Sequence, residues 1–211
     1  MSRIVKKPEE RRQEIIATAR ELFQTQEYQN TSMNNIMEKL NIAKGTIYHY
    51  FKSKDELLEA VVENIIEEDI AHKQALLQDV SANALEKFRL LITSNDATEE
   101  NDRILSYLHQ PGNVAMHTRL LAVAIEKQAQ LYANVLEEGC EEGIFEIENP
   151  LECAEFLLAG IQFLTDMGVY PWKQDDLMRR IKAYPALVEA QLKAPKGSFN
   201  FLVNQLSNSD E

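Results

Sequence analysis

The sequence predicts an all-α protein with two parts, a small N-terminal head of three short helices and a larger helical body. Apolar residues recur at helical spacing along most of the 211 residues, and the chain holds only seven glycines and six prolines. Two short helical patterns joined by a tight turn lie near the N-terminus, and a long pattern starts at Lys54. We therefore expect a head at residues 1–53, ordered from about residue 8, and a body at residues 54–211.

The first helix is expected to run from Pro8 to about Gln26. Proline suits the first turn of a helix, and Glu9 and Glu10 suit its positive end. The apolar residues of this helix fall on one face, which is expected to pack against the helices that follow. They are Ile15, Ile16, Ala19, Leu22 and Phe23. Residues 1–7 carry three basic side chains and are either an arm that touches phosphates or an ordinary mobile terminus.

The stretch from Thr31 to Leu58 has the pattern of a helix-turn-helix, whose second helix can enter the DNA major groove. Thr31 is the expected N-cap of a helix that ends at Leu40. Asn41 is expected in the turn, because asparagine tolerates the left-handed backbone conformation. A second short helix is expected at about 44–50, and Ser53 with Glu56 forms a capping-box pattern that starts the long helix.

The side chains of the second short helix suit contact with DNA. Lys44 and Thr46 can reach base edges, and Gly45 lets the backbone approach closely. Tyr48 and His49 are more suited to phosphates than to bases. Lys54 lies beside the free N–H groups of a helix start, a natural phosphate site. The candidate DNA-binding residues are Thr31, Ser32, Lys44, Gly45, Thr46, Tyr48, His49, Tyr50 and Lys54.

The charge of the chain is asymmetric. The formal net charge is −12, yet residues 1–56 hold ten basic and eight acidic side chains, whereas the remainder holds 12 basic and 26 acidic ones. The basic excess thus lies on the segment expected to meet DNA. The acidic body either favours one orientation on DNA by repulsion or simply keeps the protein in solution.

The body is expected to be helical throughout. The long helix from Lys54 should continue through Ile70 to about Leu77, and Ser81 is the expected cap of the next one. Further helices are expected before Pro111, from Asn113 to about Glu142, from Pro150, from about Asp175 to Leu192 with an interruption or kink at Pro185, and near 199–206.

The head resembles the DNA-binding region of TetR-family transcriptional regulators. The run from Asn41 to Leu57, the approach from Ile15 to Phe23, and Tyr28 and Thr31 carry the resemblance, which covers roughly residues 11–62. It implies a phosphate contact for Tyr48. Two positions depart from the family pattern: Asn41 stands where glycine is usual, and Ala43 stands where serine or threonine is usual. The second departure removes an N-cap, at a cost of about 1 kcal/mol.

The resemblance also implies the partners and the mechanism. It implies a homodimer, formed through helices at about 150–168 and 175–192, that binds a palindromic operator in double-stranded DNA. A small-molecule ligand in the body would release this repressor from DNA. The alternative is a DNA-binding protein whose body docks a protein partner and takes no small-molecule effector. An enclosed apolar cavity with a few polar groups would favour the first hypothesis, and a filled body with an exposed apolar patch the second.

The ligand pocket is expected among the helices between residues 85 and 170, and the candidates are side chains with polar tips or adaptable shapes. Each is more often a core or surface residue than a ligand contact, and the list does not reveal the chemistry of the pocket. The candidates are Tyr107, His109, Met116, His117, Tyr132, Phe163 and Trp172.

No enzyme, cofactor or metal site is expected. The sequence lacks a phosphate-binding glycine-rich loop, a nucleophile elbow and a His-Glu-x-x-His motif. His109 and His117 lie eight residues apart, but a metal site would need further ligands. Cys140 and Cys153 are expected as reduced core residues. With no long apolar run and no secretory signal, a cytoplasmic location away from membranes is expected.

Overall fold

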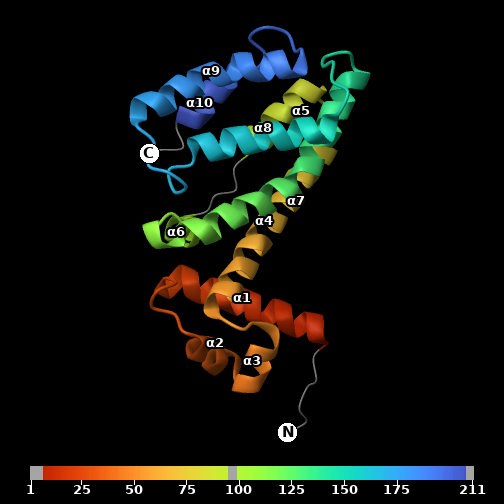
Figure 1. Cartoon of the computed structure of the whole chain (residues 1–211). Helices are drawn as coiled ribbons and strands as arrows, with labels where there is room; N and C mark the ends of the chain where they lie inside the picture. The colour runs from red at the N-terminus through yellow and green to blue at the C-terminus, as the bar shows by residue number, and fades with distance from the viewer. Residues whose placement is uncertain (1–6, 95–98, 208–211) are drawn as a thin grey trace. The chain divides into compact units, whose positions relative to one another are not determined.

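The computed structural model describes residues 7–94 and 99–207, and every regular element in these ranges is a helix (Figure 1). The predicted all-α fold is confirmed. The part of the expected N-terminal arm at residues 1–6 lies outside the described residues. The elements are α1 (Pro8–Gln26), α2 (Met33–Leu40), α3 (Lys44–Tyr50), α4 (Lys54–Asp79), α5 (Ala84–Thr93), α6 (Glu99–Leu108), η1 (Pro111–Asn113), α7 (Val114–Glu141), α8 (Pro150–Thr165), α9 (Gln174–Leu192) and α10 (Phe201–Ser207).

The chain forms two compact units, which we describe separately. The first unit comprises Met1–Ile65 and Ala97–Met116, and the second comprises Ile66–Asp96 and His117–Glu211. The division within the chain therefore falls inside α4 and again at the start of α7. The first unit also contains α6, whereas the boundary predicted from the sequence, between residues 53 and 54, assigns α6 to the body.

The first unit is built on the buried face of α1. All five apolar residues predicted for this face are at most 5% exposed, and Ile36 of α2 and Ile47 of α3 are fully buried in the same unit. Helix α6 packs against α1. There the side-chain oxygen of Asn101 accepts hydrogen bonds from Arg20 and Gln24, each at 3.2 Å. A segment about 80 residues further along the chain thus helps to hold the first helix.

Two predicted caps are wrong, and each is replaced by a neighbour. Ser32, not Thr31, caps α2, because its hydroxyl accepts from the backbone N–H of Asn35 at 3.2 Å. Asn83, not Ser81, caps α5 by accepting from the N–H of Glu86 at 3.0 Å. Both errors are shifts of one or two residues, within the range where cap signals such as Ser, Thr and Asn are interchangeable.

Two other local predictions differ from the structure. Pro185 lies inside α9, which is one helix from Gln174 to Leu192, so the predicted interruption is wrong and a kink at Pro185 stays a prediction. The hydroxyl of Ser53 accepts from the N–H of Glu56 at 3.0 Å, as a capping box requires. The carboxylate of Glu56 instead accepts from the N–H of Lys52, one residue before the expected position.

The second unit surrounds a core of aliphatic and aromatic side chains from α5, α7, α8, α9 and α10. Phe88 lies edge-on to both Tyr132 and Phe199, with ring centroids 5.6 and 5.4 Å apart. Gly139 allows the close approach of Phe145, because a Cβ atom there would lie 2.1 Å from the ring. None of the helices in the described ranges has the length and apolar character needed to cross a membrane.

Candidate nucleic-acid interface and ligand cavity

Helix α3 is held to the first unit by one side and leaves the other side open. Ile47 is fully buried, whereas Lys44, Gly45 and His49 are exposed and Thr46 is partly exposed. The turn before α3 depends on Asn41, whose backbone is left-handed at φ 51° and ψ 48°. Its N–H donates to the carbonyl oxygen of Glu38 at 3.1 Å, which closes α2.

The N-terminus of α3 lacks a side-chain cap. Ala43 occupies the N-cap position with extended backbone and has no side-chain oxygen to accept an N–H bond. The next residues remain accessible, since a Cβ atom built on Gly45 would meet nothing within 4 Å. The fold itself therefore does not require glycine at position 45, and the space beside this residue is open.

The two tyrosines of α3 are partly exposed, and each lies against a basic or polar neighbour. The ammonium of Lys44 lies 5.7 Å from the centroid of the Tyr48 ring. His49 and Tyr50 meet edge to face with centroids 5.1 Å apart. Lysine, tyrosine and histidine side chains are thus gathered on one short helix, with hydrogen-bond donors suited to phosphate oxygens.

Lys54 is used differently from the other candidate DNA contacts. Its ammonium donates to the carbonyl oxygens of Tyr28 and Thr31, at 2.9 and 2.8 Å, and lies 4.0 Å from the centroid of the Tyr28 ring. Burial lowers the pKa of Lys54, although the charge of Asp55 opposes this shift. Lys54 therefore ties the α1–α2 loop to the start of α4.

Thr31 and Ser32 also use their side chains within the protein. Thr31 is only 1% exposed, and its hydroxyl donates to the carbonyl oxygen of Glu27 at 2.9 Å. Ser32 is exposed, but its hydroxyl serves the cap of α2. These two residues position the loop before α2, and the exposed candidates gather on α3.

Tyr28 is a central residue of this unit that the sequence did not single out for a role. Its hydroxyl donates to Asp55, and the centroid of its ring lies 4.2 Å from the ring centroid of Tyr107 on α6. Burial, followed by the hydrogen bond to Asp55, raises the pKa of Tyr28 well above its ordinary value. The contact with Tyr107 has no local sequence signal, because the two residues are 79 positions apart.

A cavity of about 280 Å³ lies within the second unit. Its polar side comes from two pairs of residues at helical spacing, Asp69 with Lys73 on α4 and Gln128 with Tyr132 on α7. Ser94 and Gln162 add two further polar side chains. The rest of the wall is apolar and consists of Phe88, Leu91, Ile92, Ala154, Leu157, Leu158, Ile161, Val188 and Leu202.

One of the predicted ligand-binding residues lines this cavity, and it is Tyr132. Phe163 lines a separate apolar groove between α7 and α8. The ring centroid of Trp172 lies 4.0 Å from the guanidinium carbon of Arg180. In the first unit, Tyr107 packs on Tyr28. His109 is exposed after α6, Met116 is partly buried in the first turn of α7, and His117 is buried in α7. The cavity is therefore lined by Tyr132 alone among these seven residues.

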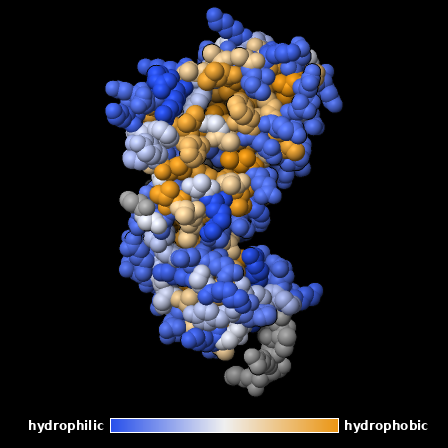
Figure 2. All heavy atoms as spheres, in the orientation of Figure 1, coloured by the Kyte–Doolittle hydropathy of each residue, from blue (hydrophilic) through white to orange (hydrophobic). Residues whose placement is uncertain are grey.

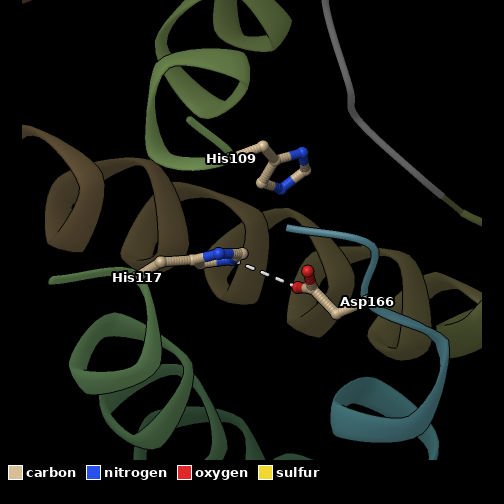
Figure 3. Close-up of side chains that lie close together, drawn as sticks. All are labelled: His109, His117 and Asp166. Carbon is tan, nitrogen blue, oxygen red and sulfur yellow. Dashed lines mark ion pairs between the residues drawn. The ribbon is translucent and has the colours of Figure 1, made fainter. Parts of the chain in front are cut away.

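His117 forms a buried ion pair with Asp166, which follows the last residue of α8 (Figure 3). The distance from Nε2 of His117 to the carboxylate is 3.1 Å, and the other carboxylate oxygen accepts from the N–H groups of Gly168 and Val169. Burial raises the pKa of Asp166, but the hydrogen bond and charge of His117, together with the N–H bonds of Val169 and Gly168, outweigh it, so the pKa lies below its ordinary value. The pair therefore holds the end of α8 against α7.

Two family models match the chain. Residues 15–61 match the model of bacterial regulatory proteins of the tetR family, and residues 95–187 match the tetracyclin repressor-like C-terminal domain. The HTH-type transcriptional repressor KstR2 of Mycobacterium tuberculosis is 26% identical over 149 residues, which cover 69% of this chain and 74% of that protein.

Solved structures share the fold. A TetR-family transcriptional regulator from Pectobacterium atrosepticum superposes with a TM-score of 0.63 at 22% identity and covers 90% of this chain and 100% of its own. RolR in complex with resorcinol superposes with a TM-score of 0.61 at 20% identity and covers 94% of each chain. With both family models in their expected order, the chain belongs to the TetR family of bacterial regulatory proteins, which are DNA-binding transcriptional regulators and not enzymes.

Proposed function

We propose that this protein is a homodimeric repressor that binds a palindromic operator through α3 and is released when a small molecule occupies the cavity of the second unit. The cavity is the observation that carries the proposal. It is mostly apolar with a few polar side chains, which is the usual composition of small-molecule sites. A ligand that prefers one spacing of the two α3 helices needs only a few kcal/mol of coupling to change operator affinity.

The DNA contacts in this proposal come from the accessible side of α3. Lys44 and Thr46 are assigned to base edges, and Tyr48, His49 and Tyr50 to phosphates. The exposure of Lys44 and His49 and the open space at Gly45 support this assignment. Thr31, Ser32 and Lys54 act indirectly, because their side chains hold the loop and the helix ends beside α3.

The dimer is proposed to form through α8 and α9, as expected for the family. Phe156 and Phe163 of α8 are 68% and 47% exposed, and Leu187 of α9 is 60% exposed. Apolar side chains gather over α8 on the face seen in Figure 2. Gly160 lies between the two phenylalanines with open space around it, so a second helix can approach closely. An apolar patch of this kind on a solvated protein commonly marks an interaction site.

The relatives support the same mechanism. KstR2 is described as a repressor, and RolR binds resorcinol. The second candidate function is that the face of α8 docks a different protein, which the same exposed phenylalanines favour. The two candidates differ in what the purified chain does alone, since only the first predicts a dimer and a ligand effect.

The deciding experiment is a gel-shift with DNA from the region upstream of the protein's own gene, together with size-exclusion chromatography. We expect a dimer that prefers one palindromic site at physiological salt, because two α3 helices about 34 Å apart are needed for tight binding. A monomer in solution would favour the protein-docking function. A dimer that binds this site and random DNA equally would contradict the assignment of this operator region.

A further inference from the structure

The charges at the wall of the cavity compensate one another. Within the described part of the chain, Asp69 and Lys73 are the only charged residues of the lining, and their side chains form an ion pair at 2.8 Å. Both are largely buried, with side chains 19% and 10% exposed. A charged ligand would therefore bury its own charge without a free counterion, which is costly in an apolar environment.

The wall nevertheless offers uncharged hydrogen-bonding groups. The side-chain amide oxygen (Oε1) of Gln162 is buried and has no hydrogen-bond partner within the described residues. Tyr132 donates only a long bond of 3.4 Å to the carbonyl oxygen of Leu91. Burial, with a smaller effect from Asp69, raises the pKa of Tyr132, so its hydroxyl stays neutral. A buried acceptor without a donor is destabilising, and a ligand that supplies the donor gains from it.

The volume limits the size of the ligand. A cavity of roughly 150 Å³ lined by aliphatic and aromatic side chains holds one benzene molecule. The cavity in this protein has about 280 Å³ and therefore suits a molecule of about two rings or the same bulk of aliphatic carbon.

We propose that the effector of this regulator is an uncharged, largely apolar molecule of about two-ring size with a hydroxyl group that hydrogen-bonds to the side-chain amide of Gln162. This inference rests on the proposed function, because it names the class of ligand that the cavity takes. The hydrocarbon part lies against α5, α8 and α9, where the wall is apolar, and the ion pair of α4 remains intact.

Isothermal titration calorimetry on the full-length protein with four probes of one size tests this class. The probes are 2-naphthol, naphthalene, 2-naphthoate and 2-naphthylmethylammonium. We expect 2-naphthol to bind most tightly, with roughly three- to tenfold higher affinity than naphthalene, the usual effect of one hydrogen bond. Equal binding of naphthol and naphthalene, tighter binding of either ion, or no binding by any probe would overturn the proposal.

Two sets of variants identify the residues. Gln162→Leu is expected to abolish the preference for naphthol over naphthalene, whereas Gln130→Leu, at an exposed position of α7 outside the cavity lining, keeps it.

Lys73→Met leaves Asp69 unpaired and is expected to raise the affinity for the ammonium probe about tenfold. Asp69→Asn is expected to do the same for naphthoate. Unchanged ion selectivity in both folded variants would contradict a charge-compensated wall.

A gel-shift with the same probes separates the two proposals. Naphthol that binds in the cavity but leaves the protein on its operator would support the ligand class and contradict release by ligand. An ion that binds more tightly than naphthol and releases the protein from its operator would support release by ligand and contradict the proposed ligand class.

Discussion

Tyr48 is the side chain of α3 whose role can be tested most directly. It is partly exposed, and the ammonium of Lys44 lies near its ring. We expect Tyr48→Ala to abolish operator binding, because a phosphate donor and the support of Lys44 are lost together, while helicity and dimerisation stay unchanged. A gel-shift, circular dichroism and size-exclusion chromatography check this. Normal operator binding by Tyr48→Ala would mean that α3 is not the recognition helix.

Lys54 is predicted to support the fold and not to contact DNA, because its ammonium donates both of its hydrogen bonds to backbone carbonyl oxygens of the same chain. We expect Lys54→Ala to lower the melting temperature and to weaken binding to all DNA sequences about equally. The slope of log affinity against log salt should stay nearly unchanged. A lysine that touches phosphate would instead reduce that slope by about one when it is removed.

Lys52 is the matched control for this experiment, since it is an exposed lysine only two residues away. Its ammonium donates to the carbonyl oxygen of Tyr48 at 3.1 Å, so Lys52→Ala should cost less stability than Lys54→Ala. If Lys54→Ala changes which sequences are bound, Lys54 reads bases and its internal contacts are not its main role.

At the scale of the helices, α3 lacks a cap that a single substitution can restore. Ala43 has the extended backbone of an N-cap but no side-chain acceptor. We expect Ala43→Ser to raise the free energy of unfolding by about 1 kcal/mol, the usual value of such a cap. Urea unfolding checks this. Asn83→Ala removes the existing cap of α5 and should lower stability by a similar amount. A loss of stability in Ala43→Ser would show that the hydroxyl does not reach the helix.

The ion pair at the end of α8 makes the stability of the second unit depend on pH. Because the folded pKa of Asp166 is below its ordinary value, ionised Asp166 stabilises the fold above pH 4, and this contribution is lost as pH falls through the folded pKa. Asp166→Asn should therefore have a flatter decline of unfolding free energy between pH 5 and pH 3. Urea unfolding at several pH values measures this decline.

Asp176→Asn is the control for the acid dependence. Its carboxylate lies 3.6 Å from Arg179 in a largely exposed pair, which solvent screens, so the variant should decline as the wild-type protein does. An equal decline in Asp166→Asn and wild type would mean that the pair with His117 does not influence stability.

The helices were predictable because their signals are local. Helical periodicity, Pro8 and Pro150 at first turns, and Asn41 in a left-handed turn gave most helices within a few residues. The caps of α2 and α5 were misplaced because neighbouring residues have the same capping ability. The candidate cavity was not predictable from the sequence, because Asp69 and Gln162 stand in ordinary helical patterns. They line one cavity only because the fold places α4 and α8 on two sides of it.

At the scale of the whole molecule, operator binding is expected to depend on the exposed face of α8. Phe156→Asp places a charge at the most exposed large apolar side chain of that helix. We expect it to convert the dimer to a monomer and to lower operator affinity at least a hundredfold, since one α3 helix makes half of the contacts. Analytical ultracentrifugation and gel-shifts measure both effects.

Gln130→Asp adds the same charge at an exposed position of α7 and should leave both properties unchanged. A Phe156→Asp variant that remains dimeric would exclude this face from the interface.

The composition of the first unit limits how regulators of this kind can be recombined. Its chain is drawn from two separate stretches, Met1–Ile65 and Ala97–Met116, and Asn101 and Tyr107 of the second stretch contact α1 and the loop after it. A chimaera made with a single crossover after α4 would combine α1 from one parent with α6 from another. A transplant of operator specificity therefore needs three crossovers, so that both stretches come from the same donor.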